Sequence, residues 1–217
     1  MPRRRLLRAP CPERRRFLVA TVVALGLATP LALAPPDAQA QAFDLGALMA
    51  LLGKAKSGEA TFVETRRIEM LDRTLQSSGR LSFKAPDSFV RETLKPRHEM
   101  LAVEGNTLTM TLGDRSRTMQ LDASPEAAVI VEAIRGTLTG NRATLERLFE
   151  TTVSGDASGW MLKLVPRDLR LRGQVSAVEV SGREGVAHEV LVQLADGDRS
   201  VMTIEPVAAR RAESSPR

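Results

Sequence analysis

Side chains that commonly do chemistry are sparse in this sequence. Its two histidines, His98 and His188, are far apart, and neither has a second histidine or a cysteine close by, so their spacing does not indicate a metal site. The sequence contains no G-x-S-x-G segment to present a nucleophilic serine. It also lacks a glycine-rich phosphate loop ahead of a helix. We therefore expect no catalytic residues, no metal and no cofactor.

Acidic and aromatic residues do not change this expectation. Asp196 and Asp198 flank Gly197, where turn formation explains both carboxylates. The chain has no tyrosine and one tryptophan, so it lacks the stacking surfaces of a sugar or nucleic-acid site. The net charge of +5 arises in residues 1–40, which hold seven arginines and two acidic residues and leave 24 basic and 24 acidic residues beyond. No nucleic-acid partner is expected.

The first 40 residues have the pattern of a secretory signal peptide. An arginine-rich segment precedes an apolar run at 17–34, and Ala38, Gln39 and Ala40 provide a small-x-small cleavage site. Cleavage is favoured over a retained anchor because the run contains Gly26 and no second apolar stretch of spanning length follows.

The single cysteine, Cys11, lies ahead of the apolar run, so it is not the lipidated cysteine of a lipoprotein. The processed chain would then have no thiol and no disulfide. Residues 14–18 approximate a twin-arginine signal, which leaves two export routes open. We expect a soluble domain at 41–206 in a bacterial periplasm, with a flexible tail at 207–217.

The centre of the chain alternates polar and apolar residues. This alternation is unbroken at 107–112 and predicts a strand with one apolar face. Further strands are predicted at 59–70, 79–84, 89–94, 98–104 and 116–121, with a polar connection at 71–78. A second group follows at 151–154, 160–165, 175–181, 187–194 and 200–205, with glycines in the intervening turns.

Helices are predicted before and between these groups. Residues 43–54 place four apolar side chains on one helical face, namely Leu45, Leu48, Met49 and Leu52. Ser124 and Pro125 start a second helix, and Asn141 starts a third. The order predicts an α+β fold, an incomplete antiparallel β-barrel of about eleven strands with a lid of about three short helices. The seven methionines beyond residue 40 suit either an ordinary core or an interior that accepts a flexible apolar guest.

Four segments carry a resemblance to a known family. They are 60–63 (ATFV), 81–89 (LSFKAPDSF), 103–108 (VEGNTL) and the strand with Trp160, Leu162, Leu164 and Pro166. Their types and order over 43–206 resemble the periplasmic outer-membrane lipoprotein carriers, the LolA family, as a divergent member.

The resemblance implies a carrier rather than an enzyme. Its hollow, covered by the helices, would bind the acyl chains of lipoproteins or another lipid for transfer toward the outer membrane. A monomer with an inner-membrane donor and an outer-membrane acceptor would follow, as for a chaperone of outer-membrane biogenesis. The alternative is a periplasmic sensor or interaction domain of the same fold, which binds lipidated ligands and a protein partner. An enzyme of lipid assembly acting through His98 or His188 is the minor alternative.

The expected cavity and lid residues follow from this comparison. The cavity residues are Phe62, Leu81, Phe83, Phe89, Leu108, Met110, Trp160 and Leu162. The lid residues are Leu48, Leu52, Ile130 and Ile134. One departure stands out: carriers of this family fasten the lid with an arginine before the proline, where this chain has Ala85. Lys84 points to the other face of the strand and is a poor substitute.

Overall fold

A computed structural model of the chain describes residues 43–71 and 73–207. The predicted signal peptide at 1–40 lies outside the described residues, as does the predicted tail after Val207. The proposed limits of the domain therefore stay a prediction.

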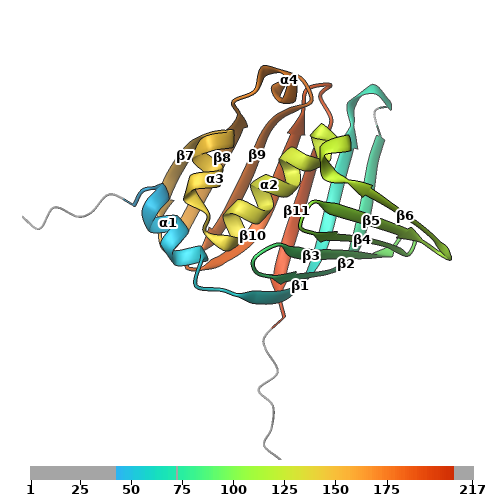
Figure 1. The fold of residues 1–217 in the computed structure, drawn as a ribbon, viewed down its shortest axis with the longest axis horizontal. Helices are drawn as coiled ribbons and strands as arrows, with labels where there is room; N and C mark the ends of the chain where they lie inside the picture. Colours follow the sequence, from blue (N-terminus) through green and yellow to red (C-terminus); the bar gives the residue numbers. More distant parts are fainter. Residues whose placement is uncertain (1–42, 72, 208–217) are drawn as a thin grey trace, which may run out of the picture. The chain divides into compact units, whose positions relative to one another are not determined.

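The described residues form a single antiparallel sheet of eleven strands (Figure 1). Its strand order is β6-β5-β4-β3-β2-β1-β11-β10-β9-β8-β7. The strands are β1 (Ser57–Ile68), β2 (Arg73–Lys84), β3 (Ser88–Lys95), β4 (Glu99–Glu104), β5 (Thr107–Leu112), β6 (Arg115–Gln120), β7 (Phe149–Asp156), β8 (Gly159–Pro166), β9 (Val175–Arg183), β10 (Val186–Leu194) and β11 (Arg199–Pro206). Within the described residues β6 and β7 do not pair with each other, so the sheet is open. This confirms the predicted incomplete barrel.

The hairpin of β1 and β2 is longer than the sequence pattern indicated. Its register runs from Ser57 opposite Lys84 to Ile68 opposite Arg73. The polar connection predicted at 71–78 is therefore wrong, because all but its first two residues belong to β2. Residues 73–76 are exposed, and backbone pairing to β1 rather than apolar burial holds them in the sheet.

Tight turns set the register of the other hairpins. Gly105 and Gly113 both have φ +56°, a conformation that side chains with a Cβ rarely adopt, and they begin the turns after β4 and β5. His98 was predicted to open a strand, but it lies in the loop just before β4.

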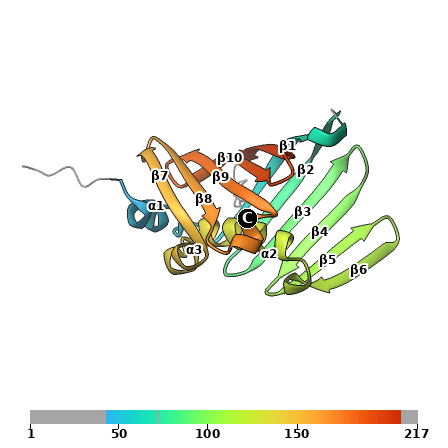
Figure 2. The same ribbon diagram turned by 90° about the horizontal axis from the view of Figure 1, so that it is seen from above.

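The described residues form four α-helices, namely α1 (Leu45–Leu52), α2 (Pro125–Thr139), α3 (Arg142–Leu148) and α4 (Leu169–Arg172). Helices α1, α2 and α3 lie on one face of the sheet, and α4 lies at the ends of β8 and β9 (Figures 1 and 2). Single 3-10 turns occur at η1 (Glu69–Leu71) and η2 (Leu121–Ala123). The single-turn helix α4 was not predicted, because it buries no residue and has no apolar periodicity. No helix of the described part is both long and apolar enough to cross a membrane.

Two separate apolar clusters lie between helices and sheet. The larger one joins α1, α2 and α3 to strands β7–β10, and its members include Leu48, Leu145, Phe149 and Leu164. The smaller one, built on Val103, Leu108 and Leu121, lies at the β4–β5 end of the sheet. Helix α2 belongs to both clusters and spans the strands between them, so the middle of the sheet is covered but not filled.

Candidate functional site: an apolar cavity beneath helix α2

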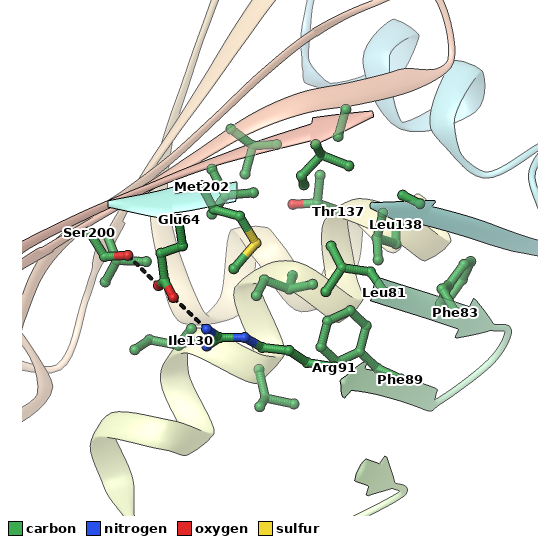
Figure 3. Close-up of a pocket in the computed structure, with 18 of the residues that line it drawn as sticks. Glu64, Leu81, Phe83, Phe89, Arg91, Ile130, Thr137, Leu138, Ser200 and Met202 are labelled. Atoms are coloured by element: carbon green, nitrogen blue, oxygen red, sulfur yellow. Dashed lines mark hydrogen bonds and ion pairs between the residues drawn. The ribbon is translucent and has the colours of Figure 1, made fainter. Parts of the chain in front are cut away.

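A cavity of about 490 Å³ lies between the middle of the sheet and α2 (Figure 3). This volume falls within the roughly 300–1,000 Å³ of small-molecule binding sites. The sheet supplies one apolar wall, which includes Leu81, Phe83, Phe89, Val190, Met202 and Ile204. The helix supplies the other, with Ile130, Val131, Ile134 and Leu138.

Strand register explains the sheet wall. Ala60 pairs with Leu81, which pairs in turn with Arg91, so these side chains form one row across β1, β2 and β3. The next row toward the end of the hairpin has Phe83 opposite Phe89. Because alternate residues of a strand share a face, both rows point toward α2.

Helix α2 has two apolar faces that differ in residue size. Its buried residues are Val129, Ala133, Gly136 and Thr137, which pack toward α3 and the larger cluster. A Cβ at Gly136 would lie 2.6 Å from Leu145 Cδ2, so glycine permits this close packing. The larger side chains of Ile130, Ile134 and Leu138 are only half-buried, because the space in front of them is the cavity.

A polar cluster interrupts the apolar wall. Arg91 and Glu64 form an ion pair through Arg91 Nη2, and their side chains are 27% and 15% exposed. Glu64 also accepts hydrogen bonds from Ser77 Oγ at 3.0 Å and from Ser200 Oγ at 2.5 Å. The guanidinium carbon of Arg91 lies 4.9 Å from the centroid of the Phe62 ring. Figure 3 shows Arg91 extending from the side of Phe89 toward Glu64 and Ser200.

A second ion pair lies farther along the same wall. Arg66 Nη2 contacts Asp198 Oδ2 at 3.1 Å, and the Glu69 amide donates to Asp198 Oδ1 at 3.1 Å. Charged residues in the cavity wall are four carboxylates and three arginines: Glu59, Glu64, Glu126, Asp198, Arg66, Arg91 and Arg199. The charges of the two signs nearly balance, so the wall does not select for a strongly charged ligand.

The structure places the twelve predicted site residues in four surroundings. Seven of them line the cavity, namely Leu81, Phe83, Phe89, Leu108, Leu52, Ile130 and Ile134. Leu48, Trp160 and Leu162 lie in the larger packed cluster. Phe62 is 1% exposed beneath Arg91, and Met110 lies outside the cavity wall with 37% of its surface exposed. Among the seven methionines of the described chain only Met202 lines the cavity, so most of them do not serve it.

A link between α2 and the sheet was not predicted from the sequence. Arg135 on α2 donates from Nη2 to the Gly105 carbonyl at 2.5 Å and pairs through Nη1 with Glu132 at 2.6 Å. Lys84, the residue beside Ala85, is exposed. In this protein an arginine of α2 therefore links the covering helix to the β4–β5 turn of the sheet.

The histidines lie apart from the cavity wall. His98 Nε2 contacts Glu92 Oε1 at 3.1 Å, and Arg183 Nε donates to His188 Nε2 at 3.3 Å. Within 43–71 and 73–207, no group of three or more histidine, cysteine or acidic residues is arranged to hold a metal ion.

An open antiparallel sheet with an apolar cavity under its covering helices defines a half-barrel protein with an internal hollow. A family model described as outer membrane lipoprotein carrier protein LolA-like matches residues 37–214. The chain belongs to this LolA-like family. A search of curated proteins found no significant match.

Solved structures with a similar fold share little sequence with this chain. The LolA superfamily protein NE2245 from Nitrosomonas europaea is 12% identical, with 73% of this chain and 91% of that chain covered and a TM-score of 0.42. A DUF1329 family protein from Desulfovibrio piger is 11% identical, with 75% and 89% covered and a TM-score of 0.44. LprF from Mycobacterium bovis is 12% identical, with 76% and 93% covered and a TM-score of 0.36.

Proposed function

We propose that this protein is a periplasmic carrier that binds the acyl chains of a lipoprotein or another lipid in the cavity beneath α2. It would take its cargo from an inner-membrane donor and deliver it toward the outer membrane. Family membership supports a carrier of this kind, and the signal-peptide pattern of residues 1–40 supports its location.

The observation that carries the proposal is the pair of facing apolar walls. Phe83 and Phe89 on the sheet and Ile130 and Ile134 on α2 border the same space and remain half-buried. A folded protein ordinarily fills such a space with its own side chains, because close packing stabilises the core. An acyl chain would complete the burial, at roughly 0.8 kcal/mol for each methylene removed from water.

Carrier function needs no catalytic group in this cavity. The ligand must enter and leave, so its cover must be able to move away from the sheet. Two short helices, α1 and α3, and the Arg135 link hold α2 in place, and elements with limited buried contact are those that open most readily.

Native mass spectrometry tests the binding step. The purified protein would be incubated with phospholipid vesicles and separately with a diacylated lipopeptide. We expect a complex carrying the mass of one lipid or one lipopeptide. Retention of the unliganded mass with every lipid class would contradict the proposal. Transfer of a fluorescent lipopeptide between two vesicle populations would then distinguish a carrier from a protein that only binds.

A further inference from the structure

Arg91 stands where two hollows of the molecule meet. The apolar cavity lies on one side of it, and a second hollow of about 410 Å³ lies on the other. Arg91 and Leu101 belong to the walls of both. The second hollow is bordered for the most part by residues with polar side chains, namely Ser77, Thr93, Arg97 and Glu99, with Pro96 beside them. A ligand that occupied both would have an apolar part and a polar part, with Arg91 at their junction.

The guanidinium group of Arg91 does not use all of its N–H donors. Its Nη2 donates to Glu64 and to Ser77 Oγ, the latter at 3.2 Å. Its Nε is the only buried side-chain nitrogen or oxygen of the described chain that has no hydrogen-bond partner. Buried donors are nearly always paired, and a small turn of the Arg91 side chain, which is 27% exposed, would bring this N–H to the cavity, where an acceptor on a ligand would pair it.

The charge of Arg91 is already neutralised by Glu64. An anionic group placed against Arg91 would also lie close to the Glu64 carboxylate and be repelled by it. A neutral acceptor avoids this repulsion and still uses the free N–H groups. The second hollow is likewise balanced, with Arg97 and Glu99 as its other charged residues.

We propose that Arg91 hydrogen-bonds the ester or amide carbonyl at which an acyl chain joins its head group. The apolar chain lies in the cavity under α2, and the polar head, without net negative charge, lies in the second hollow. This inference rests on the proposed lipid-binding function and names the chemical group that the site selects. Glu64, Ser77 and Ser200 act as positioning residues, because their hydrogen bonds hold the ion pair at the junction.

A pair of lipids that differ only in this carbonyl tests the inference. Calorimetric titration would compare dioctanoyl phosphatidylcholine with its dioctyl ether analogue, which has the same head and nearly the same apolar surface. We expect the ester to bind the wild-type protein about tenfold more tightly, because a hydrogen bond to a charged donor is lost with the ether. A diacylated lipopeptide and its ether analogue should show the same ratio, since the shared group is the acyl carbonyl.

Variants assign the preference to Arg91. Arg91→Lys keeps a positive charge opposite Glu64 but removes the guanidinium donors, so both lipids should bind with the affinity of the ether. The control, Arg80→Lys, changes an arginine of the same hairpin that is 68% exposed, and it should keep the tenfold ratio. Equal affinities in the wild-type protein, tighter binding of octanoate than of the ester, or an unchanged ratio in Arg91→Lys would overturn the inference. If neither lipid bound, the lipid-binding function itself would fail with it.

Discussion

Arg135 in the C-terminal half of α2 donates a hydrogen bond of 2.5 Å to the carbonyl oxygen of Gly105 in the β4–β5 turn. The same side chain pairs with Glu132 one turn earlier in the helix. Helix α2 is thereby tied to the sheet on the side opposite α1 and α3. The bond crosses from the cover of the cavity to its wall, so breaking it should ease the movement of α2.

Replacing Arg135 with methionine should loosen α2 without unfolding the protein. One hydrogen bond with a charged donor stabilises the closed position by about 1–2 kcal/mol. We expect amide exchange in α2 to become about five- to thirtyfold faster, measured by hydrogen–deuterium exchange mass spectrometry. The control is Arg147→Met on α3, an exposed arginine, which should leave the exchange of α2 unchanged. Equal exchange in Arg135→Met and wild type would show that the link does not hold the helix.

Filling the cavity should abolish binding and preserve the fold. Val190 on β10 lines the cavity and pairs with Met202 on β11, so the ring of Val190→Trp would occupy ligand space. We expect the fraction of lipid-bound protein in native mass spectra to fall at least tenfold, with little change in the thermal midpoint. The control, Val63→Trp, adds the same ring at a position that is 56% exposed on the outer face of β1. Equal lipid binding by the two variants would be incompatible with a ligand in this cavity.

The Glu64–Arg91 pair should behave as a coupled unit. Glu64→Gln removes one charge and leaves the partly buried guanidinium without its counter-ion, which should lower the free energy of unfolding by about 1–3 kcal/mol. Adding Arg91→Met to this variant should restore part of the loss, since no unpaired charge then remains. Urea denaturation of the single and double variants measures both effects.

A surface ion pair supplies the control for that series. Lys163 Nζ lies 2.9 Å from Glu179 Oε1, with the lysine side chain 47% exposed. Because solvent screens such pairs, Glu179→Gln should cost no more than about 0.5 kcal/mol. Losses of similar size in Glu64→Gln and Glu179→Gln would mean that the cavity pair has no special coupling.

Packing between α2 and α3 depends on a glycine. Alanine at Gly136 would raise helix propensity by about 1 kcal/mol, but its Cβ would lie 2.6 Å from Cδ2 of the fully buried Leu145. Overpacking of this kind costs about 1–3 kcal/mol, so Gly136→Ala should be destabilising overall by up to about 2 kcal/mol. The control is Gly159→Ala, where a new Cβ meets no atom within 4 Å. A rise in the thermal midpoint of Gly136→Ala would show that α3 can shift away freely.

Local patterns predicted most elements of the fold. The alternation at 107–112 coincides with β5, and the capping residues before α2 and α3 locate both helix starts. Local patterns failed where backbone pairing alone orders the chain, as in the exposed part of β2, and where a helix is one turn long, as in α4. Both lack the apolar periodicity on which such predictions depend.

The cavity itself was less accessible to sequence reasoning. Trp160 and Leu162 alternate just as Leu81 and Phe83 do, yet the first pair packs under helices and the second borders open space. Contacts between residues distant in sequence decide which strands the helices pack against. One feature of the polar cluster could be predicted from the sequence. Phe62 and Glu64 share a face of β1, so the strand places a carboxylate among inward-facing apolar residues.

Crystallography of the protein bound to a diacyl lipid with brominated chains would locate the ligand directly. The proposed function predicts anomalous bromine peaks between the Phe89 wall of the sheet and the Ile130 face of α2. Bromine peaks confined to the outer face of the sheet, with the space beneath α2 still free of lipid, would contradict it.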